Sequence, residues 1–288
     1  MRRGLMIVAV CLAGCARDAV PPAPRPALEE PPVASSPAGT PDLCPAQAPM
    51  IAARSALLLD ARTGRVLYQK NADARTQVAS TQKLLSALLV VRSGDLDRQV
   101  VIQEQDTRVE PTKLGLRAGE RYSRRSLLTA MMVKSENDAA AALARDVAGS
   151  VTTFVAGMNH MAWDLGARNS FFANPHGLPA PQYSTARDIG RIAFCAYREP
   201  TLRQMMATRT MTFVFNSGRR KFLENTNKLL KRNPFVNGMK TGYTDAAGRC
   251  LVASASSGGK DLIFVQLGSR TTFIFDDAER MLAWGMQQ

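Results

Sequence analysis

A serine and a lysine three residues apart, Ser80 and Lys83, form the first pair whose types and spacing could perform covalent chemistry. They open a segment with helical periodicity, and side chains three residues apart on a helix share a face within hydrogen-bonding reach. A serine hydroxyl is a weak nucleophile until a neighbouring base takes its proton. A lysine amine is such a base only when uncharged, which requires burial or a second cation nearby. The pair therefore predicts a serine nucleophile with a lysine base.

Ser135 and Asn137 make a second polar cluster, at the junction between two helical patterns. At such a junction, short polar side chains can point into a cleft without interrupting a helix interior. The alternative for Asn137 is an ordinary helix N-cap before Asp138. The cluster is thus compatible with either a catalytic or a capping role.

The third cluster is Lys240-Thr241-Gly242, which lies in a strand-like segment near the end of the chain. A lysine and a threonine side by side can bind a carboxylate. A glycine in a strand lets another backbone approach closely, and here we expect that backbone to be the substrate's. The cluster predicts a binding site for a peptide that ends in a carboxylate.

Two of these short patterns also occur where no site is expected. Ser257 and Lys260 repeat the serine-lysine spacing in a turn that has no helix to align them. Arg62-Thr63-Gly64 resembles the third cluster and is most simply a hairpin turn. The prediction of a site therefore depends on the three clusters occurring together, in this order, within one domain.

Composition argues against several other classes of protein. The two histidines, His160 and His176, have no spacing that would hold zinc, and no Gly-x-Ser-x-Gly elbow or glycine-rich phosphate loop is present. We therefore expect neither a metal nor a cofactor. The formal charge of +13 suits a polyanionic neighbour, but aromatic residues are 6% and do not interleave with the basic ones. We read the charge as a solvated basic surface and expect no nucleic-acid partner.

The amino terminus predicts export. Arg2 and Arg3 precede an apolar run over residues 5–14, which is shorter than the roughly 20 residues that cross a bilayer. The run ends in Leu12-Ala13-Gly14-Cys15, which resembles the lipobox of bacterial lipoproteins. That resemblance implies a signal peptide over residues 1–14 and lipidation of Cys15. The alternative is a signal peptide cut elsewhere, with Cys15 incidental.

A proline-rich segment separates the predicted signal peptide and lipidation site from the rest of the chain. Ten of the 16 prolines fall in residues 21–49, without hydrophobic periodicity, so residues 15–49 are expected to be an extended linker. Residues 50–288 are expected to be one domain. Cys44, Cys195 and Cys250 can form at most one disulfide, and the sequence does not say which.

The elements that must position the three clusters follow from periodicity. Strands at both ends of the domain with helices between them predict one antiparallel sheet, joined by the first hairpin, with helices on its faces. The helix that begins near Ser80 should bury Leu84, Leu85, Leu88 and Leu89. Further helices are predicted at 126–134, 138–147, 151–165 (closed by Gly166), 185–197, 199–207 and 276–286, and strands at 56–60, 66–70, 210–215, 239–243, 250–255 and 262–267.

In the order of the three clusters and in the motifs around them, the sequence resembles the low-molecular-weight penicillin-binding proteins. These proteins are D-alanyl-D-alanine carboxypeptidases and endopeptidases. The resemblance covers nearly all of residues 52–286. It implies a β-lactamase/transpeptidase-like α+β fold, with a five-stranded antiparallel sheet flanked by helices and an all-helical region. The supporting motifs are Tyr68-Gln69-Lys70-Asn71-Ala72-Asp73, Asn174-Pro175-His176-Gly177-Leu178, Gln182-Tyr183-Ser184-Thr185-Ala186, Asn225-Thr226-Asn227 and Gly238-Met239-Lys240-Thr241-Gly242-Tyr243-Thr244-Asp245.

The resemblance implies a role for each cluster. Ser80 would attack the carbonyl between two D-alanines, Lys83 would accept its proton, and Ser135 would relay a proton to the leaving amine while Asn137 positions the peptide. The family further implies that Lys240 and Thr241 hold the substrate carboxylate, that Gly242 lies beside them, and that the backbone N–H groups of Ser80 and Tyr243 form the oxyanion hole. The implied partners are peptidoglycan stem peptides, and β-lactams as covalent inhibitors.

Departures from the family pattern keep the subclass open. Glu136 stands where the carboxypeptidases usually have glycine, which, together with residues 246–251, resembles the endopeptidase branch. Carboxypeptidase activity remains the first expectation and endopeptidase activity the alternative. A β-lactamase is a rival because Glu199 superficially resembles the water-activating glutamate of that class, although Arg203 follows where asparagine would be wanted. A catalytically idle penicillin-binding lipoprotein is a second rival. The expected location is the periplasmic side of a bacterial membrane, with Cys15 as the lipid anchor and the outer membrane as the expected one.

Overall fold

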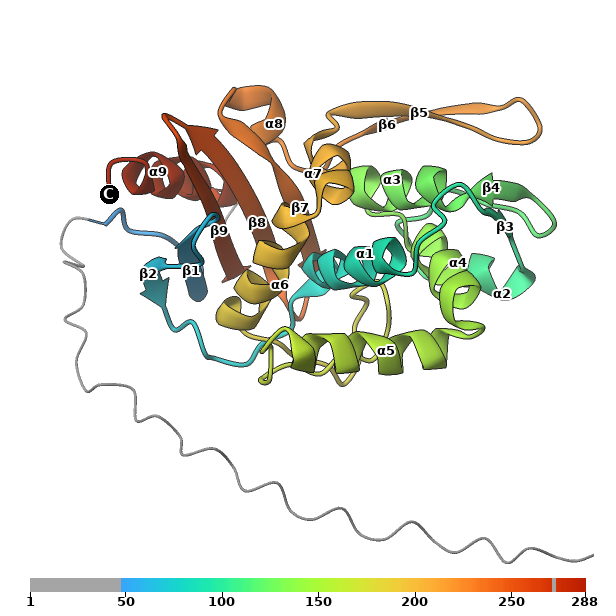
Figure 1. Ribbon diagram of the computed structural model, residues 1–288, viewed down its shortest axis with the longest axis horizontal. Coiled ribbons are helices and arrows are strands. Elements are labelled where there is room, and N and C mark those ends of the chain that lie inside the picture. The colour runs from blue at the N-terminus through green and yellow to red at the C-terminus, as the bar shows by residue number, and fades with distance from the viewer. Residues whose placement is uncertain (1–47, 271–272) are drawn as a thin grey trace, which may run out of the picture. The chain divides into compact units, whose positions relative to one another are not determined.

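A five-stranded antiparallel sheet is the frame on which the described residues are arranged (Figure 1). The structure is a computed structural model, which describes residues 48–270 and 273–288. The strand order is β2-β1-β9-β8-β7, so the first hairpin joins the last strand of the chain, as predicted. The fold class expected from the resemblance is confirmed. The strands are β1 (Ser55–Asp60), β2 (Val66–Lys70), β7 (Val236–Thr244), β8 (Gly248–Ser257) and β9 (Lys260–Ser269).

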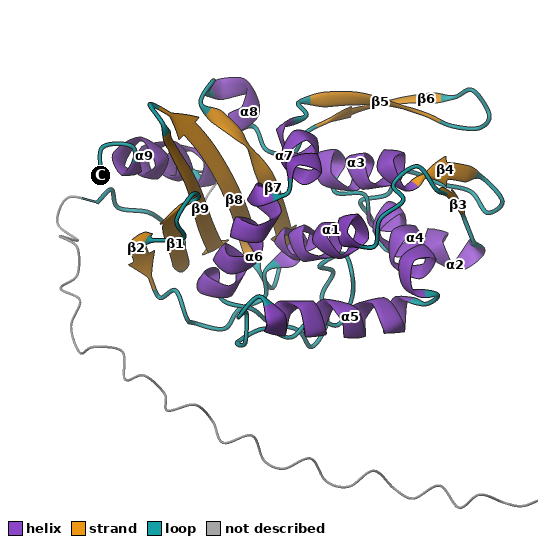
Figure 2. Cartoon of the chain, viewed as in Figure 1, coloured by secondary structure: helices purple, strands orange, loops and turns teal. Residues whose placement is uncertain are grey.

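Helices cover both faces of this sheet (Figure 2). Helix α6 (Ala186–Arg198) packs against β1 and β9 on one face, and α9 (Ile274–Gly285) packs against the same strands and β8 on the other. Successive side chains of a strand point to opposite faces, and accordingly Leu57 and Leu58 belong to two different hydrophobic cores. The three central strands β1, β9 and β8 are therefore buried on both sides, which explains why their buried stretches are mainly apolar.

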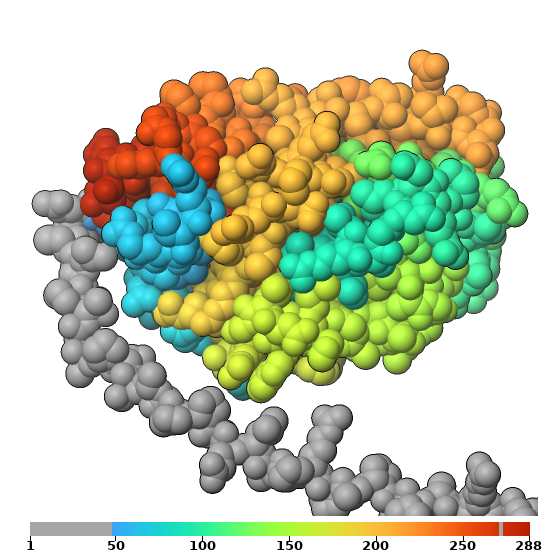
Figure 3. Space-filling view, viewed as in Figure 1, coloured from blue at the N-terminus to red at the C-terminus, as the bar shows by residue number. Residues whose placement is uncertain are grey.

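A second, mainly helical region surrounds α1 (Lys83–Arg92). Helices α6 and α7 lie between α1 and the sheet on the face that Figure 3 shows. The predicted buried face of α1 is confirmed for Leu84, Leu85 and Leu88, whereas Leu89 is only half-buried. The other helices are α2 (Glu104–Thr107), α3 (Arg124–Lys134), α4 (Asn137–Ala148), α5 (Val151–Asp164), α7 (Pro200–Ala207) and α8 (Leu229–Arg232).

The helix boundaries have local causes that can be read from the residues. The side chains of Ser123 and Thr185 accept hydrogen bonds from the first turns of α3 and α6, as N-caps do. Pro200 occupies the first turn of α7, where its missing N–H costs no hydrogen bond. Gly166 follows α5 with a φ of +76°, which confirms the predicted C-terminal stop.

One predicted strand has a different partner from the one expected. The segment predicted at 210–215 is β5 (Thr210–Val214), and it pairs with β6 (Arg220–Glu224) in a separate two-stranded ribbon rather than joining the main sheet. A second small ribbon, β3 (Gln99–Val101) with β4 (Arg121–Ser123), was not predicted. Both ribbons are short or polar, so hydrophobic periodicity could not assign their partners.

The predicted signal peptide, lipidation site and linker lie largely outside the described residues. The signal peptide over 1–14, Cys15 and nearly all of the linker to residue 49 fall in this part, so they remain predictions. Cys44 also lies there, and Cys195 and Cys250 are both free thiols. Among the residues that the structure describes, no helix combines the length and apolarity needed to cross a membrane.

Candidate active site

Ser80 and Lys83 lie at the start of α1, as predicted. Residues Ala79–Gln82 form a single 3₁₀ turn that leads directly into α1. This turn brings Nζ of Lys83 to 2.9 Å from Oγ of Ser80. The hydroxyl and the amine are therefore within proton-transfer distance.

The amine of Lys83 contacts three further polar groups. It lies 3.3 Å from Oγ of Ser135, 2.7 Å from Oδ1 of Asn137 and 2.7 Å from the carbonyl oxygen of His176. The two predicted clusters thus meet at this amine, although they are more than 50 positions apart in the sequence. None of the four contacts is a carboxylate, so no negative charge touches the amine directly.

Lys83 meets the condition for a lysine base. Its side chain is fully buried, and burial lowers its pKa well below the ordinary value. The positive charge of Lys240 lowers the pKa further, while Glu136 and Asp138 act in the opposite direction. Burial and a second cation, the two causes anticipated from the sequence, therefore act together.

The turn between α3 and α4 aims the second cluster at Lys83. Ser135 ends α3 in the left-handed conformation, with a φ of +71°, which turns its side chain out of the helix. Helix α4 begins at Asn137 and its N-cap is Glu136, so the alternative interpretation of Asn137 as an N-cap is wrong. The Asn137 amide instead donates to the carbonyl of Glu110 at 2.9 Å, which leaves its oxygen for Lys83.

Gly242 brings β7 against the nucleophile. A Cβ atom on this glycine would lie 2.8 Å from the backbone nitrogen of Ser80, closer than real Cβ contacts, and 3.0 Å from Cβ of Ala79, which is tighter than most. Gly242 therefore lets the backbone of the 3₁₀ turn meet the strand, and it also lines the cavity, where the approach of a substrate backbone stays a prediction.

Lys240 and Thr241 lie at different depths on β7. Thr241 lines the cavity and its hydroxyl donates to that of Thr226 at 2.6 Å. Lys240 is 1% exposed, donates to the carbonyl of Thr241 at 3.0 Å, and does not line the cavity. Burial lowers the pKa of Lys240 to about 7. Its charge therefore acts on the site from behind the cavity wall.

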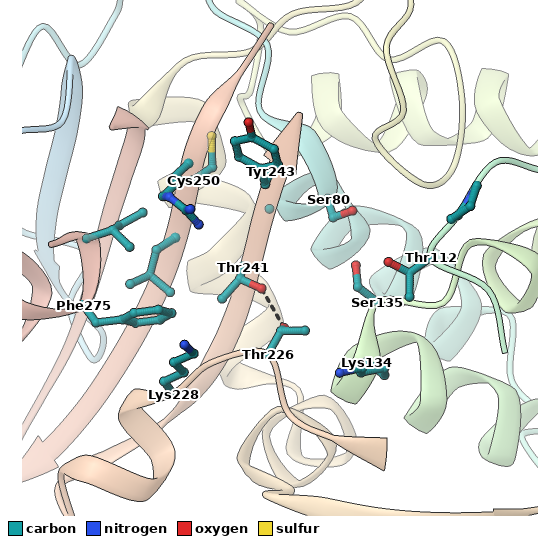
Figure 4. Close-up of a pocket in the computed structure, with 15 residues that line it drawn as sticks. Ser80, Thr112, Lys134, Ser135, Thr226, Lys228, Thr241, Tyr243, Cys250 and Phe275 are labelled. Carbon is teal, nitrogen blue, oxygen red and sulfur yellow. Dashed lines mark hydrogen bonds between the residues drawn. The ribbon is translucent and has the colours of Figure 1, made fainter. Parts of the chain in front are cut away.

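A cavity of about 490 Å³ opens beside Ser80 (Figure 4). The predicted residues Ser80, Ser135, Thr241, Gly242 and Tyr243 line it, whereas Lys83 and Asn137 lie buried behind them. The cavity thus exposes Ser80, whereas the Lys83 amine lies buried behind it. The other lining residues are Pro111, Thr112, Lys134, Thr226, Lys228, Arg249, Cys250, Leu251, Ile274 and Phe275.

The carbonyl of His176 was missing from the predicted site. Its position depends on Asn174, whose Oδ1 accepts from the N–H of Gly177 at 2.8 Å and whose amide donates to the carbonyl of Leu178 at 2.9 Å. Gly177 has a φ of +87°, and a Cβ there would lie 2.2 Å from the backbone oxygen of Ala79. The Asn-Pro-His-Gly motif was the available signal, and its role is backbone geometry rather than imidazole chemistry.

Glu136 was noted as a departure, and the structure shows its surroundings. Its side chain is fully buried, and Oε1 accepts from Nζ of Lys221 on β6 at 3.2 Å. Its other oxygen, Oε2, has no partner within the described residues. Burial raises the pKa of this carboxyl group. The contact ties the β5–β6 ribbon to the turn that carries Ser135 and Asn137.

A serine that contacts a buried lysine at a helix start, beside the edge strand of an antiparallel sheet, defines a serine acyl-transfer site. The family model described as D-alanyl-D-alanine carboxypeptidase, peptidase family S11, matches residues 43–271. The chain belongs to this family, and the resemblance seen in its motifs is confirmed.

Several relatives and solved structures support this assignment. The chain is 36% identical to D-alanyl-D-alanine carboxypeptidase DacC of Escherichia coli, over 84% of this chain and 63% of that protein. It is 34% identical to a D-alanyl-D-alanine endopeptidase of Pseudomonas aeruginosa, over 81% and 77%. A D-alanyl-D-alanine carboxypeptidase structure from Mycobacterium tuberculosis superposes with a TM-score of 0.80 at 31% identity, covering 84% of this chain and 93% of that one. The chain spans 58% and 63% of the length of two of its carboxypeptidase relatives.

Proposed function

We propose that this protein is a serine-type D-alanyl-D-alanine carboxypeptidase that removes the terminal D-alanine from peptidoglycan stem peptides. The observation that carries the proposal is the contact of 2.9 Å between Ser80 and a fully buried Lys83. Family membership supplies the substrate class. The geometry supplies a nucleophile, a base and a cavity beside them.

The first step of the proposed reaction forms an acyl-enzyme. The neutral amine of Lys83 takes the proton of Ser80 as Oγ attacks the carbonyl carbon of the penultimate D-alanine. The backbone N–H groups of Ser80 and Tyr243 stabilise the oxyanion, since preorganised donors act most strongly on charge that develops in the transition state. The close approach of β7 to Ser80 at Gly242 supports this pairing of strand and turn.

Loss of the amine from the tetrahedral intermediate completes the acyl-enzyme, and hydrolysis of that ester is the second step, which returns the enzyme to its starting state. Ser135, 3.3 Å from the Lys83 amine, passes the proton to the leaving amine, and the C–N bond breaks. A water molecule then attacks the ester with Lys83 as its base, and the shortened peptide leaves as a carboxylate. Thr241, which lines the cavity, binds the substrate's terminal carboxylate during the first step, and the charge of the buried Lys240 attracts it from behind the cavity wall. Asn137 fixes the position of the Lys83 amine.

A penicillin trap combined with product analysis tests the proposal. Purified protein is expected to form a stable covalent adduct with a labelled penicillin, and to release one D-alanine from an uncrosslinked pentapeptide, as seen by mass. Ser80→Ala abolishes both signals. Release of the penicillin within seconds would make the protein a β-lactamase, and an adduct that survives Ser80→Ala would revive the non-catalytic alternative.

DD-endopeptidase activity is the second candidate, and it is favoured by the match to an endopeptidase over 77% of that protein's length. The same nucleophile and base serve both reactions, which differ only in the leaving group. Conversion of a cross-linked dimer to monomers, followed by mass, tests this candidate.

We further propose that the protein is exported and held by a lipid on Cys15 at the periplasmic side of a bacterial membrane, with the outer membrane as the expected one. The charged and apolar start of the sequence and its Leu-Ala-Gly-Cys motif support this proposal. Metabolic labelling with a radioactive fatty acid tests it. The label is expected in the membrane fraction and is lost in Cys15→Ala, whereas label retained by that variant would refute the anchor.

A further inference from the structure

The ammonium group of Lys221 joins three segments of the chain beside the site. Lys221 lies on β6, and its Nζ donates to the carbonyl of Lys113 at 2.8 Å and to that of Leu114 at 3.1 Å. Its third contact is with Oε1 of Glu136 at 3.2 Å. Three acceptors match the three N–H bonds of an ammonium group. One cation therefore holds together the β5–β6 ribbon, a loop and the turn that carries the second cluster.

The loop that Lys221 contacts is also fastened to the start of α4. The carbonyl of Thr112, which lines the cavity, accepts from the N–H of Asn137 at 2.8 Å. The carboxylate of Asp138 accepts from the N–H groups of residues 114–116. These contacts fix the loop without Lys221. The contact that depends on the lysine charge is therefore the one with Glu136.

The carboxylate of Glu136 needs a cation in order to stay charged. Its side chain is fully buried, and burial disfavours the charged form of a carboxyl group. Burial raises the pKa of Glu136, and Asp138 raises it further, whereas Lys221 and, to a smaller extent, Lys134 lower it. Of these two cations, Lys221 is the one in contact with the carboxylate. Loss of its charge would therefore favour the protonated form of Glu136.

The charge of Glu136 acts in turn on both buried lysines of the site. It raises the pKa of Lys83 on α1 and that of Lys240 on β7, against the effect of burial. Asp138 also raises the pKa of Lys83, but backbone N–H groups already bind its oxygens. A protonated Glu136 no longer has this effect, so the pKa values of both lysines would fall.

We propose that Lys221 is a positioning residue of the acylation reaction, which holds Glu136 in its charged form and thereby sets the protonation of the base Lys83 and of Lys240. The inference rests on the proposed function, because it concerns the base of that reaction. Lys221 does not line the cavity, so it acts through Glu136 and not on the substrate. The β5–β6 ribbon, which carries none of the three predicted clusters, thus becomes part of the catalytic apparatus.

The test is the pH dependence of acylation by a chromogenic β-lactam, measured alongside kcat/KM for release of D-alanine. Lys221→Met keeps a side chain of similar length but removes the charge. It is expected to move both limbs of the profile to lower pH by about one pH unit, since Glu136 becomes protonated and the two lysines lose a proton more readily. Lys221→Arg keeps the cation and is expected to restore the limbs of the wild type.

A double-mutant cycle separates this role from a contribution to folding alone. In the Glu136→Gln background, Lys221→Met is expected to add no further shift of the limbs, because the charge through which it acts is already gone. Lys221→Gln is the second uncharged variant, since it keeps a donor for the carbonyls of Lys113 and Leu114. It is expected to shift the limbs as Lys221→Met does, even if the methionine variant is less stable to heat.

The matched control is Arg220→Met, which removes an equal charge from the neighbouring position of β6, where the side chain is exposed on the opposite face. Its limbs are expected to coincide with those of the wild type. Limbs that stay in place in both uncharged variants of Lys221, or that shift further when Lys221→Met is added to Glu136→Gln, would overturn the proposal. A wild-type protein that forms no adduct with the β-lactam would instead refute the proposed function, and this inference with it.

Discussion

Two segments of this chain place a serine three residues before a lysine, and they differ in everything except that spacing. Ser80 and Lys83 meet at 2.9 Å at the start of a helix, with the lysine fully buried. Ser257 and Lys260 flank a Gly-Gly turn between β8 and β9, and the Lys260 amine is bound by the backbone of Met286. The comparison shows that spacing supplies the candidates, whereas burial and convergence with distant segments make a site.

A similar contrast separates Lys240-Thr241-Gly242 from Arg62-Thr63-Gly64. Lys240 is buried behind the cavity, and Gly242 of the same cluster lies against the backbone of Ser80. Arg62 lies in an exposed turn and donates to the carbonyl of Gly259.

Removal of the two serine hydroxyls is expected to give the largest difference. Ser80→Ala abolishes covalent attachment of penicillin, because it removes the hydroxyl that forms the ester. Ser257→Ala keeps the wild-type rate, because that serine lies in a turn remote from the cavity. The measurement is the mass of the protein after incubation with the antibiotic. A persistent adduct in Ser80→Ala would remove the basis of the comparison.

Removal of the two amines is expected to give the next largest difference. Lys83→Gln keeps a polar group of similar size but has no basic nitrogen, so acylation slows about a thousandfold, in the range for loss of a general base. Lys260→Gln acylates at the wild-type rate. Stopped-flow acylation by a chromogenic β-lactam measures both rates. A loss smaller than tenfold in Lys83→Gln would mean that another group takes the serine proton.

Substitution of Gly242 is expected to reduce activity, whereas substitution of Gly64 is expected to reduce only stability. In Gly242→Ala the new Cβ meets the backbone of Ser80, so β7 or the 3₁₀ turn must shift, and kcat/KM falls about a hundredfold. In Gly64→Ala the Cβ has ordinary contacts with Phe194, and the φ of +78° costs about 1 kcal/mol of folding free energy with little effect on kcat/KM. Thermal unfolding and kinetics on both variants test this. Full activity in Gly242→Ala would contradict the close approach.

The two buried lysines of the site are expected to produce a bell-shaped pH dependence. Lys83 accepts a proton only above its lowered pKa, so kcat/KM rises with pH on the acid side. Lys240 attracts the substrate carboxylate only while charged, so kcat/KM falls as pH rises through its pKa of about 7. Lys240→Arg keeps its charge at high pH and removes the alkaline limb. An unchanged alkaline limb in that variant would assign it to another group.

Glu136 is expected to give the smallest effect, a shift in pH dependence. Its negative charge raises the pKa values of Lys83 and Lys240, so Glu136→Gln moves both limbs of the profile toward lower pH. The maximum of kcat/KM changes less than tenfold, because the carboxylate does not touch the reacting atoms. Lys221→Met is the companion variant, since it breaks the 3.2 Å contact and keeps the carboxyl group. Limbs that stay in place in Glu136→Gln would exclude this electrostatic role.

The sequence by itself determined the local features of this protein. Alternating and helical apolar patterns predicted the five strands of the main sheet and most helices, because burial of one face imposes a period on neighbouring residues. The order of the three clusters predicted a nucleophile, its base and a carboxylate-binding strand, and the structure brings the first two clusters together at the Lys83 amine. These patterns could not predict the left-handed backbone conformation of Ser135 or the close packing at Gly242, because each depends on a partner elsewhere in the chain.

Tertiary structure alone decided how the distant segments combine. The carbonyl of His176 reaches Lys83 through an Asn174 turn, and the polar ribbon β5–β6 reaches Glu136 through Lys221. The cavity brings together Lys134, Lys228 and Phe275 from three separate parts of the chain. The physical reason is the same in each case: a contact between residues far apart in the chain leaves no periodicity in either segment, so it exists only once the sheet and the helices have packed.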